Sequence, residues 1–98
     1  MKNCEINGEL IRRDEKSDEF NKYSYELLVR RGNEVANFRL PLYSVRVSMT
    51  DAYGNRTVKG LADAFADENR AISFYELAVK NLATPLNLPF ILEDFAIS

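Results

Sequence analysis

The spacing of apolar residues changes once along this chain, near Asp67, and that change restricts the fold more than any other feature. Before it, apolar and polar residues alternate, as in the segment from Tyr43 to Thr50, which is typical of a half-buried strand. After it, apolar residues recur at the spacing of an amphipathic helix: Ala71, Ile72, Tyr75, Ala78, Val79 and Leu82. The pattern predicts strands first and helices last, in an α+β fold.

The alternating part, residues 23–64, predicts an antiparallel sheet of three to four strands joined by hairpins. Gly32-Asn33 is typical of a two-residue turn, which would set Tyr25 opposite Leu40 and Tyr23 opposite Leu42. The same register sets Glu26 opposite Arg39. Apolar pairs on one face and an opposite-charge pair on the other therefore support the same register.

A second turn at Ala52-Tyr53-Gly54-Asn55 joins the next two strands. Pairing Asp51 with Arg56 sets Met49 opposite Val58 and Val47 opposite Gly60. A five-residue loop would instead oppose Val47 to Lys59, which is the less favourable pair. We therefore expect the first register.

The remaining segments complete one small domain over residues 1–98, since this length suits a single core. Asn7-Gly8 suggests a weak N-terminal hairpin over 2–13, and the charged run that follows suggests a polar loop over 14–22. Asp67 is a suitable N-cap for a helix over 67–83. Thr84-Pro85 introduces a shorter helix over 88–96, and both helices are expected to pack on one face of the sheet.

The residue counts argue against most catalytic sites. The chain has no histidine, the usual general base near neutral pH, and a single cysteine. These counts exclude histidine-based triads, internal disulfides and the common zinc sets, and the four glycines are too scattered for a phosphate loop. We predict no enzymatic activity, no metal and no cofactor.

The N-terminus lacks the apolar core of a secretion signal, and no apolar run approaches the roughly 18 residues of a membrane-spanning helix. We therefore expect a cytoplasmic protein with no membrane partner. The net charge of −2 disfavours nucleic acid as a partner, because such modules usually carry a positive excess.

Two residues of the first helix, Phe74 and Leu77, point away from its apolar stripe. Either the closing helix folds over them, or they form with Phe90 an exposed patch that binds a second copy, as a homodimer, or another protein. The alternative function is contact with nucleic acid through an arginine-bearing sheet face, for which the candidates are Arg30, Arg39 and Arg46. The alternation places Tyr23, Tyr25 and Tyr43 inside, which removes the aromatic platform that such binding needs.

The second half also resembles a known family. The residues that carry the resemblance are Tyr43-Ser44-Val45-Arg46-Val47, Gly54, Val58, Phe65-Ala66-Asp67, Thr84-Pro85-Leu86-Asn87-Leu88 and Glu93-Asp94-Phe95. They are similar to a family of small proteins of anaerobic Gram-positive bacteria, a domain of unknown function, over roughly residues 43–96. Tyr23 and Tyr25 match the same pattern more weakly.

This chain departs from the family's pattern in three places. Ser44 replaces a glycine, Phe65-Ala66 replaces the usual residues before the helix, and Pro89 is additional. The resemblance implies a strand-rich first half, a C-terminal helical pair and no assigned activity. Together with the residue counts, it leads us to expect a small binding or assembly module that acts through protein–protein contacts or self-association.

Overall fold

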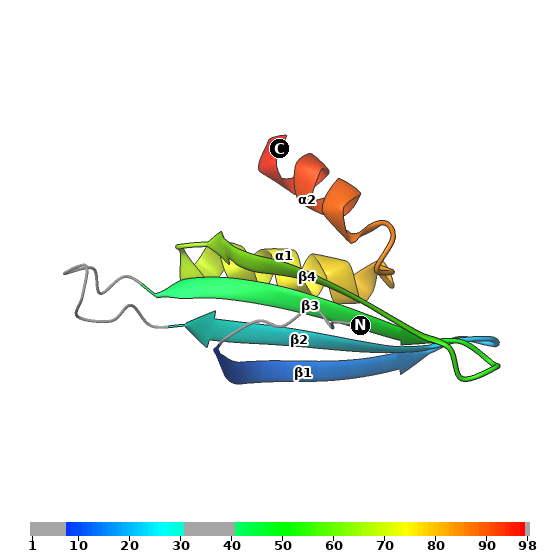
Figure 1. The fold of residues 1–98 in the computed structure, drawn as a ribbon. Coiled ribbons are helices and arrows are strands. Elements are labelled where there is room, and N and C mark those ends of the chain that lie inside the picture. Colours follow the sequence, from blue (N-terminus) through cyan, green and yellow to red (C-terminus); the bar gives the residue numbers. More distant parts are fainter. Residues whose placement is uncertain (1–7, 31–40, 98) are drawn as a thin grey trace.

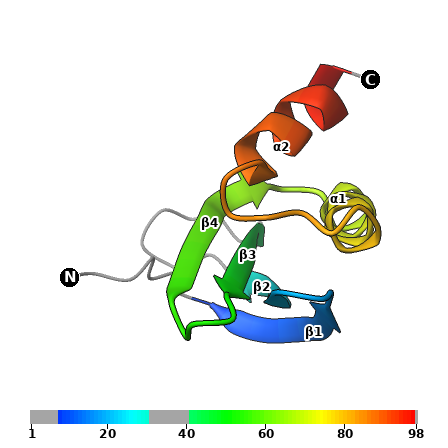
Figure 2. The same ribbon diagram turned by 90° about the vertical axis from the view of Figure 1, so that its right-hand side faces the viewer.

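The structure is a computed structural model that describes residues 8–30 and 41–97. In this part of the chain, four antiparallel strands form one sheet in the order β1-β2-β3-β4, and two helices follow them (Figure 1). The elements are β1 (Glu9–Ser17), β2 (Lys22–Arg30), β3 (Leu42–Thr50), β4 (Arg56–Phe65), α1 (Glu68–Lys80) and α2 (Leu88–Ile97). Helix α1 packs against one face of the twisted sheet, and α2 lies beside α1 at the β4 edge (Figure 2). The α+β fold expected from the sequence is confirmed.

Strand β1 corrects the prediction for the N-terminal segment. Residues 14–17, expected within a polar loop over 14–22, belong to β1, and only residues 18–21 connect it to β2. The strand forms despite its charges because it lies at the edge of the sheet, where both faces of its outer part reach water. Residues 9–13 pair with β2, and the other arm of the expected hairpin over 2–13 lies outside the described residues.

The expected partner of β2 was also wrong. Strand β2 pairs with β3, so that Tyr25 lies opposite Val47 and Arg30, rather than Tyr23, lies opposite Leu42. The acidic Glu26 meets Arg46. The expected hairpin arm with Arg39 and Leu40 lies outside the described residues. Arg46 has the same charge and the same place in the alternation as Arg39, so the face pattern alone could not choose between them.

Between β3 and β4 the structure has the register that the sequence disfavoured. Met49 lies opposite Thr57 and Val47 opposite Lys59, with residues 51–55 in the connection. The Asp51 carboxylate determines this, because it accepts hydrogen bonds from the backbone N–H groups of Tyr53 and Asn55, both at 2.9 Å. A local side-chain acceptor can set the turn length regardless of which pairs follow.

A bulge in β4 then restores apolar pairing near the end of the strand. Asp63 has a φ of 52°, and its backbone N–H donates to Ser44 Oγ at 2.8 Å. The register shifts at this point, which brings Tyr43 opposite Phe65.

The helices begin where the sequence predicted. The Asp67 side chain accepts from the N–H of Arg70, as an N-cap should, and α1 ends at Lys80, three residues before the expected 83. Thr84 and Asn87 exchange side-chain to backbone hydrogen bonds in the turn before α2. The buried residues of α1 are Ala71, Phe74, Tyr75 and Ala78, so its buried face is rotated away from the expected Ile72 and Val79.

The core lies between the sheet and the helices. Tyr23, Tyr25 and Tyr43 are buried in it, which confirms the expected inward orientation. The Tyr25 hydroxyl donates to the carbonyl of Ala83 at 2.8 Å, and the Tyr75 hydroxyl donates to Asp14 at 2.7 Å. These hydroxyls need partners because burial of an unbonded polar group is costly. In the described residues, no helix is long and apolar enough to cross a membrane.

Candidate functional site

The residues expected to form a partner patch differ in their exposure to solvent. Phe74 has no exposed surface, since its ring packs against those of Phe65 and Phe95 at centroid distances of 5.3 and 5.5 Å. Leu77 is half-buried, and Phe90 is 63% exposed. The closing helix therefore covers Phe74, as one of the two interpretations expected. Phe74 is wrong as a docking residue, whereas Phe90 stays a candidate.

Phe90 directly follows Pro89, which lines a surface that the fold assembles from β4 and the start of α2. A depression of about 300 Å³ is lined there by Thr57, Val58, Lys59, Pro85, Leu86 and Pro89. We call these residues, together with Phe90, the β4–α2 surface. Leu86 is 83% exposed, so two large apolar side chains reach solvent next to the depression. This surface is apolar with one cation, Lys59.

The helix α2 explains why this surface is apolar. Its sequence contains only two charged residues, Glu93 and Asp94, yet Leu88 is the one residue of the described helix that is buried. Ile91, Leu92 and Phe95 are half-buried against the core. Phe95 of this helix packs against Phe65 of β4 and Phe74 of α1, whereas Phe90 is open to solvent.

The arginines of the alternative interface are not free cations. The Arg30 guanidinium binds the Asp63 carboxylate at 2.6 Å, and the hydrogen bond to Asp63 raises the pKa of Arg30. Arg46 pairs with Glu26 across two strands. Arg39 lies outside the described residues. Because each described arginine of this set meets a carboxylate, the sheet face presents little net positive charge there.

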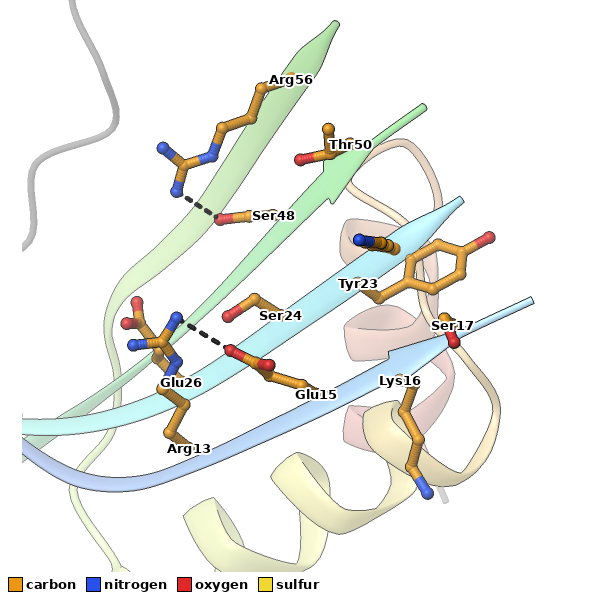
Figure 3. Close-up of a pocket in the computed structure, with 11 residues that line it drawn as sticks. Arg13, Glu15, Lys16, Ser17, Tyr23, Ser24, Glu26, Ser48, Thr50 and Arg56 are labelled. Atoms are coloured by element: carbon orange, nitrogen blue, oxygen red, sulfur yellow. Dashed lines mark hydrogen bonds and ion pairs between the residues drawn. The ribbon is translucent and has the colours of Figure 1, made fainter. Parts of the chain in front are cut away.

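The same outer face of the sheet carries a wider, polar depression of about 710 Å³ (Figure 3). Within it Arg13 pairs with Glu15 at 3.0 Å, while Arg56 donates to the Ser48 hydroxyl at 3.2 Å. Ser24 and Thr50 also line it. The depression could hold a polar ligand loosely, but its mixed charges define no single class of ligand.

Two turns lie together at the end of the sheet where β1 meets β2 and β3 meets β4 (Figure 1). Each turn begins with an aspartate whose carboxylate accepts the N–H two residues on, Asp18 from Phe20 and Asp51 from Tyr53. Backbone hydrogen bonds, above all from Asn21 to Asp18 and from Asn55 to Asp51, hold the pKa of both carboxyl groups below the usual value. Phe20 and Tyr53 are 68% and 90% exposed. The geometry shows two hydrogen-bonded turns, each presenting an aromatic ring.

A polar network joins the edge strand β1 to α1. Arg12 binds Asp14 at 3.1 Å and Glu76 at 3.0 Å, and its guanidinium lies 5.2 Å from the centre of the Tyr75 ring. Burial and the Asp14 carboxylate raise the pKa of Tyr75 well above its usual value. A phenol held this strongly in its neutral form is a poor nucleophile or base at neutral pH. The network therefore has a structural role, since it connects β1 to α1.

Sequence reasoning predicted the turn that contains Tyr53, but it did not single out Leu86, Lys59 or the exposed rings of Phe20 and Tyr53 as parts of a surface. Leu86 stands in a turn between Pro85 and Asn87, and this context was a usable signal, because turn residues seldom face a core. Lys59 could not be found in this way, since its neighbours depend on how α2 packs beside β4. Within residues 8–30 and 41–97, no group of three or more acidic or cysteine side chains is placed to hold a metal ion.

Comparison with known proteins adds one finding. The model of a family of unknown function, DUF6514, matches residues 6–98. This match extends the resemblance from the second half of the chain to nearly all of it, including β1 and β2. No curated protein and no solved structure matches the chain.

Proposed function

We propose that this chain, which belongs to the DUF6514 family of unknown function, is a small module that acts through protein–protein contacts or self-association. We propose further that it is a bacterial, cytoplasmic protein and that it is not an enzyme. The observation that carries it is the β4–α2 surface, where Leu86 and Phe90 are exposed beside an apolar depression.

Large apolar groups that are left in water favour docking, because burying them against a partner lowers the free energy. Exposed single apolar residues are ordinary, but two large ones beside an apolar depression form a contiguous patch, which is characteristic of interaction sites. Aromatic side chains are enriched among the residues that contribute most to binding. Phe90 meets this description because it is exposed, aromatic and held on a regular helix.

The test is cross-linking in cells that express the chain naturally, followed by recovery of the tagged chain. We expect the wild-type chain to be recovered with a protein partner, either itself or another protein, and Phe90→Asp to lose most of it. The matched control is Phe20→Ser, which changes an equally exposed phenylalanine, 68% against 63%, in the loop between β1 and β2. Equal recovery with all three chains would refute the proposal.

The alternative, contact with nucleic acid, has weaker support. Arg30 and Arg46 are already bonded to carboxylates, and the net charge of the chain is −2. Binding through phosphates would require free cations and would weaken steeply with salt. Salt-dependent binding of a labelled single strand, lost in the Arg30→Ala and Arg46→Ala variants, would favour this alternative over protein binding.

A further inference from the structure

We infer that the β4–α2 surface binds the same surface of a second copy of the chain, around a two-fold axis. This inference rests on the proposed function and names its partner. The observations that carry it are the position of Phe90 beside a depression and the opposite charges on the two elements that form the surface.

The shape of the surface is suited to pairing with itself. A two-fold interface repeats every contact. If residue i of one copy contacts residue j of the other, then residue j of the first copy contacts residue i of the second. Such a contact needs a protruding group and a receiving depression within one patch. Phe90 protrudes immediately after Pro89, and Pro89 lines the depression with Val58 and Pro85. Two copies can therefore each place Phe90 in the other's depression.

The charges of the surface point to the same partner. Lys59 on β4 is exposed, and no ion pair engages it in the described ranges. Glu93 and Asp94 on α2 are also exposed, and they too have no ion pair with any described residue. Glu93 follows Pro89 by about one helical turn, so the part of α2 next to the surface is acidic, whereas Lys59 makes the strand side basic.

This arrangement distinguishes between the candidate partners. An acidic peptide would satisfy Lys59 but would meet Glu93 and Asp94 with like charge, and a basic peptide would do the reverse. A second copy related by a two-fold axis brings the lysine of each chain to the acids of the other. Both sets of charges are then paired, and complementary potentials of this kind select partners and set their orientation.

The first experiment measures association of the full-length chain by sedimentation velocity over a wide concentration range. We expect a reversible dimer of the wild-type chain. Phe90→Asp should raise the dimer dissociation constant at least about tenfold, as expected when a central aromatic is removed. Phe20→Ser, the matched aromatic control, should leave the constant unchanged.

The second experiment exchanges the charges. Lys59→Glu alone and the double variant Glu93→Lys with Asp94→Lys should each weaken the homodimer, because each sets like charges against one another. Mixing the two variants should restore association, since every contact then joins opposite charges. Lys22→Glu, a charge reversal at an exposed position on β2, should leave the homodimer intact.

The outcomes separate this inference from the proposed function. The inference would be overturned if Phe90→Asp left the dimer dissociation constant unchanged. It would also be overturned if the two charge variants did not associate when mixed. A wild-type chain that stays monomeric would also overturn it. If that monomer still captured a different protein through Phe90 in the cross-linking test, the proposed function would stand. A monomer without Phe90-dependent capture would overturn both.

Discussion

Replacing Tyr25 with phenylalanine removes one hydrogen-bond donor and preserves the ring that fills the core. Tyr25 lies on β2 and has no exposed surface, and its hydroxyl donates to the carbonyl oxygen of Ala83 at 2.8 Å. Ala83 is equally buried and belongs to the connection between α1 and α2. The bond therefore fastens the start of α2, and with it the β4–α2 surface, to the sheet.

The cost of this substitution follows from the carbonyl that it leaves behind. A buried acceptor that loses its donor costs about 1–3 kcal/mol, because neither water nor another group replaces the bond. A domain of this size has a total stability of about 5–15 kcal/mol. The loss should lower the melting temperature by about 5–20 °C.

The assay is equilibrium unfolding in urea, followed by circular dichroism. We expect a lower midpoint at an unchanged slope, since the surface exposed on unfolding stays the same. Tyr53→Phe is the matched control, because its ring is 90% exposed, and it should change the free energy of unfolding by less than about 0.5 kcal/mol. A Tyr25→Phe variant as stable as this control would refute the reasoning.

The same hydroxyl makes the fold sensitive to alkali. Burial raises the pKa of Tyr25 to about 12, from 10.0 in an unfolded chain. Because the folded pKa is the higher one, the stabilisation is complete below pH 10.0 and is lost as the pH rises toward about 12. Tyr25→Phe should lose less stability across this window than the wild-type chain. Part of the dependence should remain, because the pKa of Tyr75 is also raised.

Three further predictions concern the core, the helix start and the turns. Phe74→Ala should lower the free energy of unfolding in urea by about 3–5 kcal/mol, because Phe65 and Phe95 lose their common neighbour; a loss below about 1 kcal/mol would contradict this packing. Asp67→Ala should cost about 1 kcal/mol in the same assay, and Asp67→Asn should cost less because an amide oxygen still caps the helix. The lowered pKa values of Asp18 and Asp51 mean that their stabilisation is complete above pH 3.8 and is lost as the pH falls through the folded values. Acid unfolding monitored by circular dichroism should therefore depend less on pH in Asp51→Asn than in the wild-type chain, and an unchanged profile would argue against this role.

The strands and helices could be predicted because their signals are local. The alternation in the segments of β2 and β3 identified the inward tyrosines, and Asp67 marked the start of α1. The second half of β1, residues 14–17, escaped prediction because residues 12–16 are all charged. Its polar face is stabilised by contacts from Arg12 and Asp14 to α1, which no local pattern displays.

Strand pairing could be predicted only in part. Glu26 had two arginines in equivalent positions of the alternation, Arg39 and Arg46, and the pairing with β3 chose the second. Between β3 and β4, side-chain pairing favoured one register and the hydrogen bonds of Asp51 required another. Turn geometry prevailed because the Asp51 carboxylate accepts two backbone N–H groups within the five-residue connection.

For the candidate site, sequence reasoning named Phe90 and left Phe74 open between cover by the closing helix and an exposed patch; the structure shows the cover. The apolar stripe of α1 is centred on Ala71 and Tyr75. Phe74 lies outside this stripe if the sheet is the only element that packs against the helix. In the structure α2 covers a second side of α1, so the buried face is wider and includes Phe74. The residues that line the depression come from two segments about thirty residues apart, 57–59 and 85–89, which only packing could bring together.

The amino-acid order by itself determined the kinds of element, the inward tyrosines, the helix caps and the lack of histidine-based chemistry. Each of these depends on a residue type or on a spacing within one or two turns of chain. Tertiary structure alone decided the strand partners, the register at β4, the burial of Phe74 and the meeting of Lys59 with Pro85 and Pro89. These features depend on which distant surfaces exclude water together, and a linear pattern carries no record of that choice.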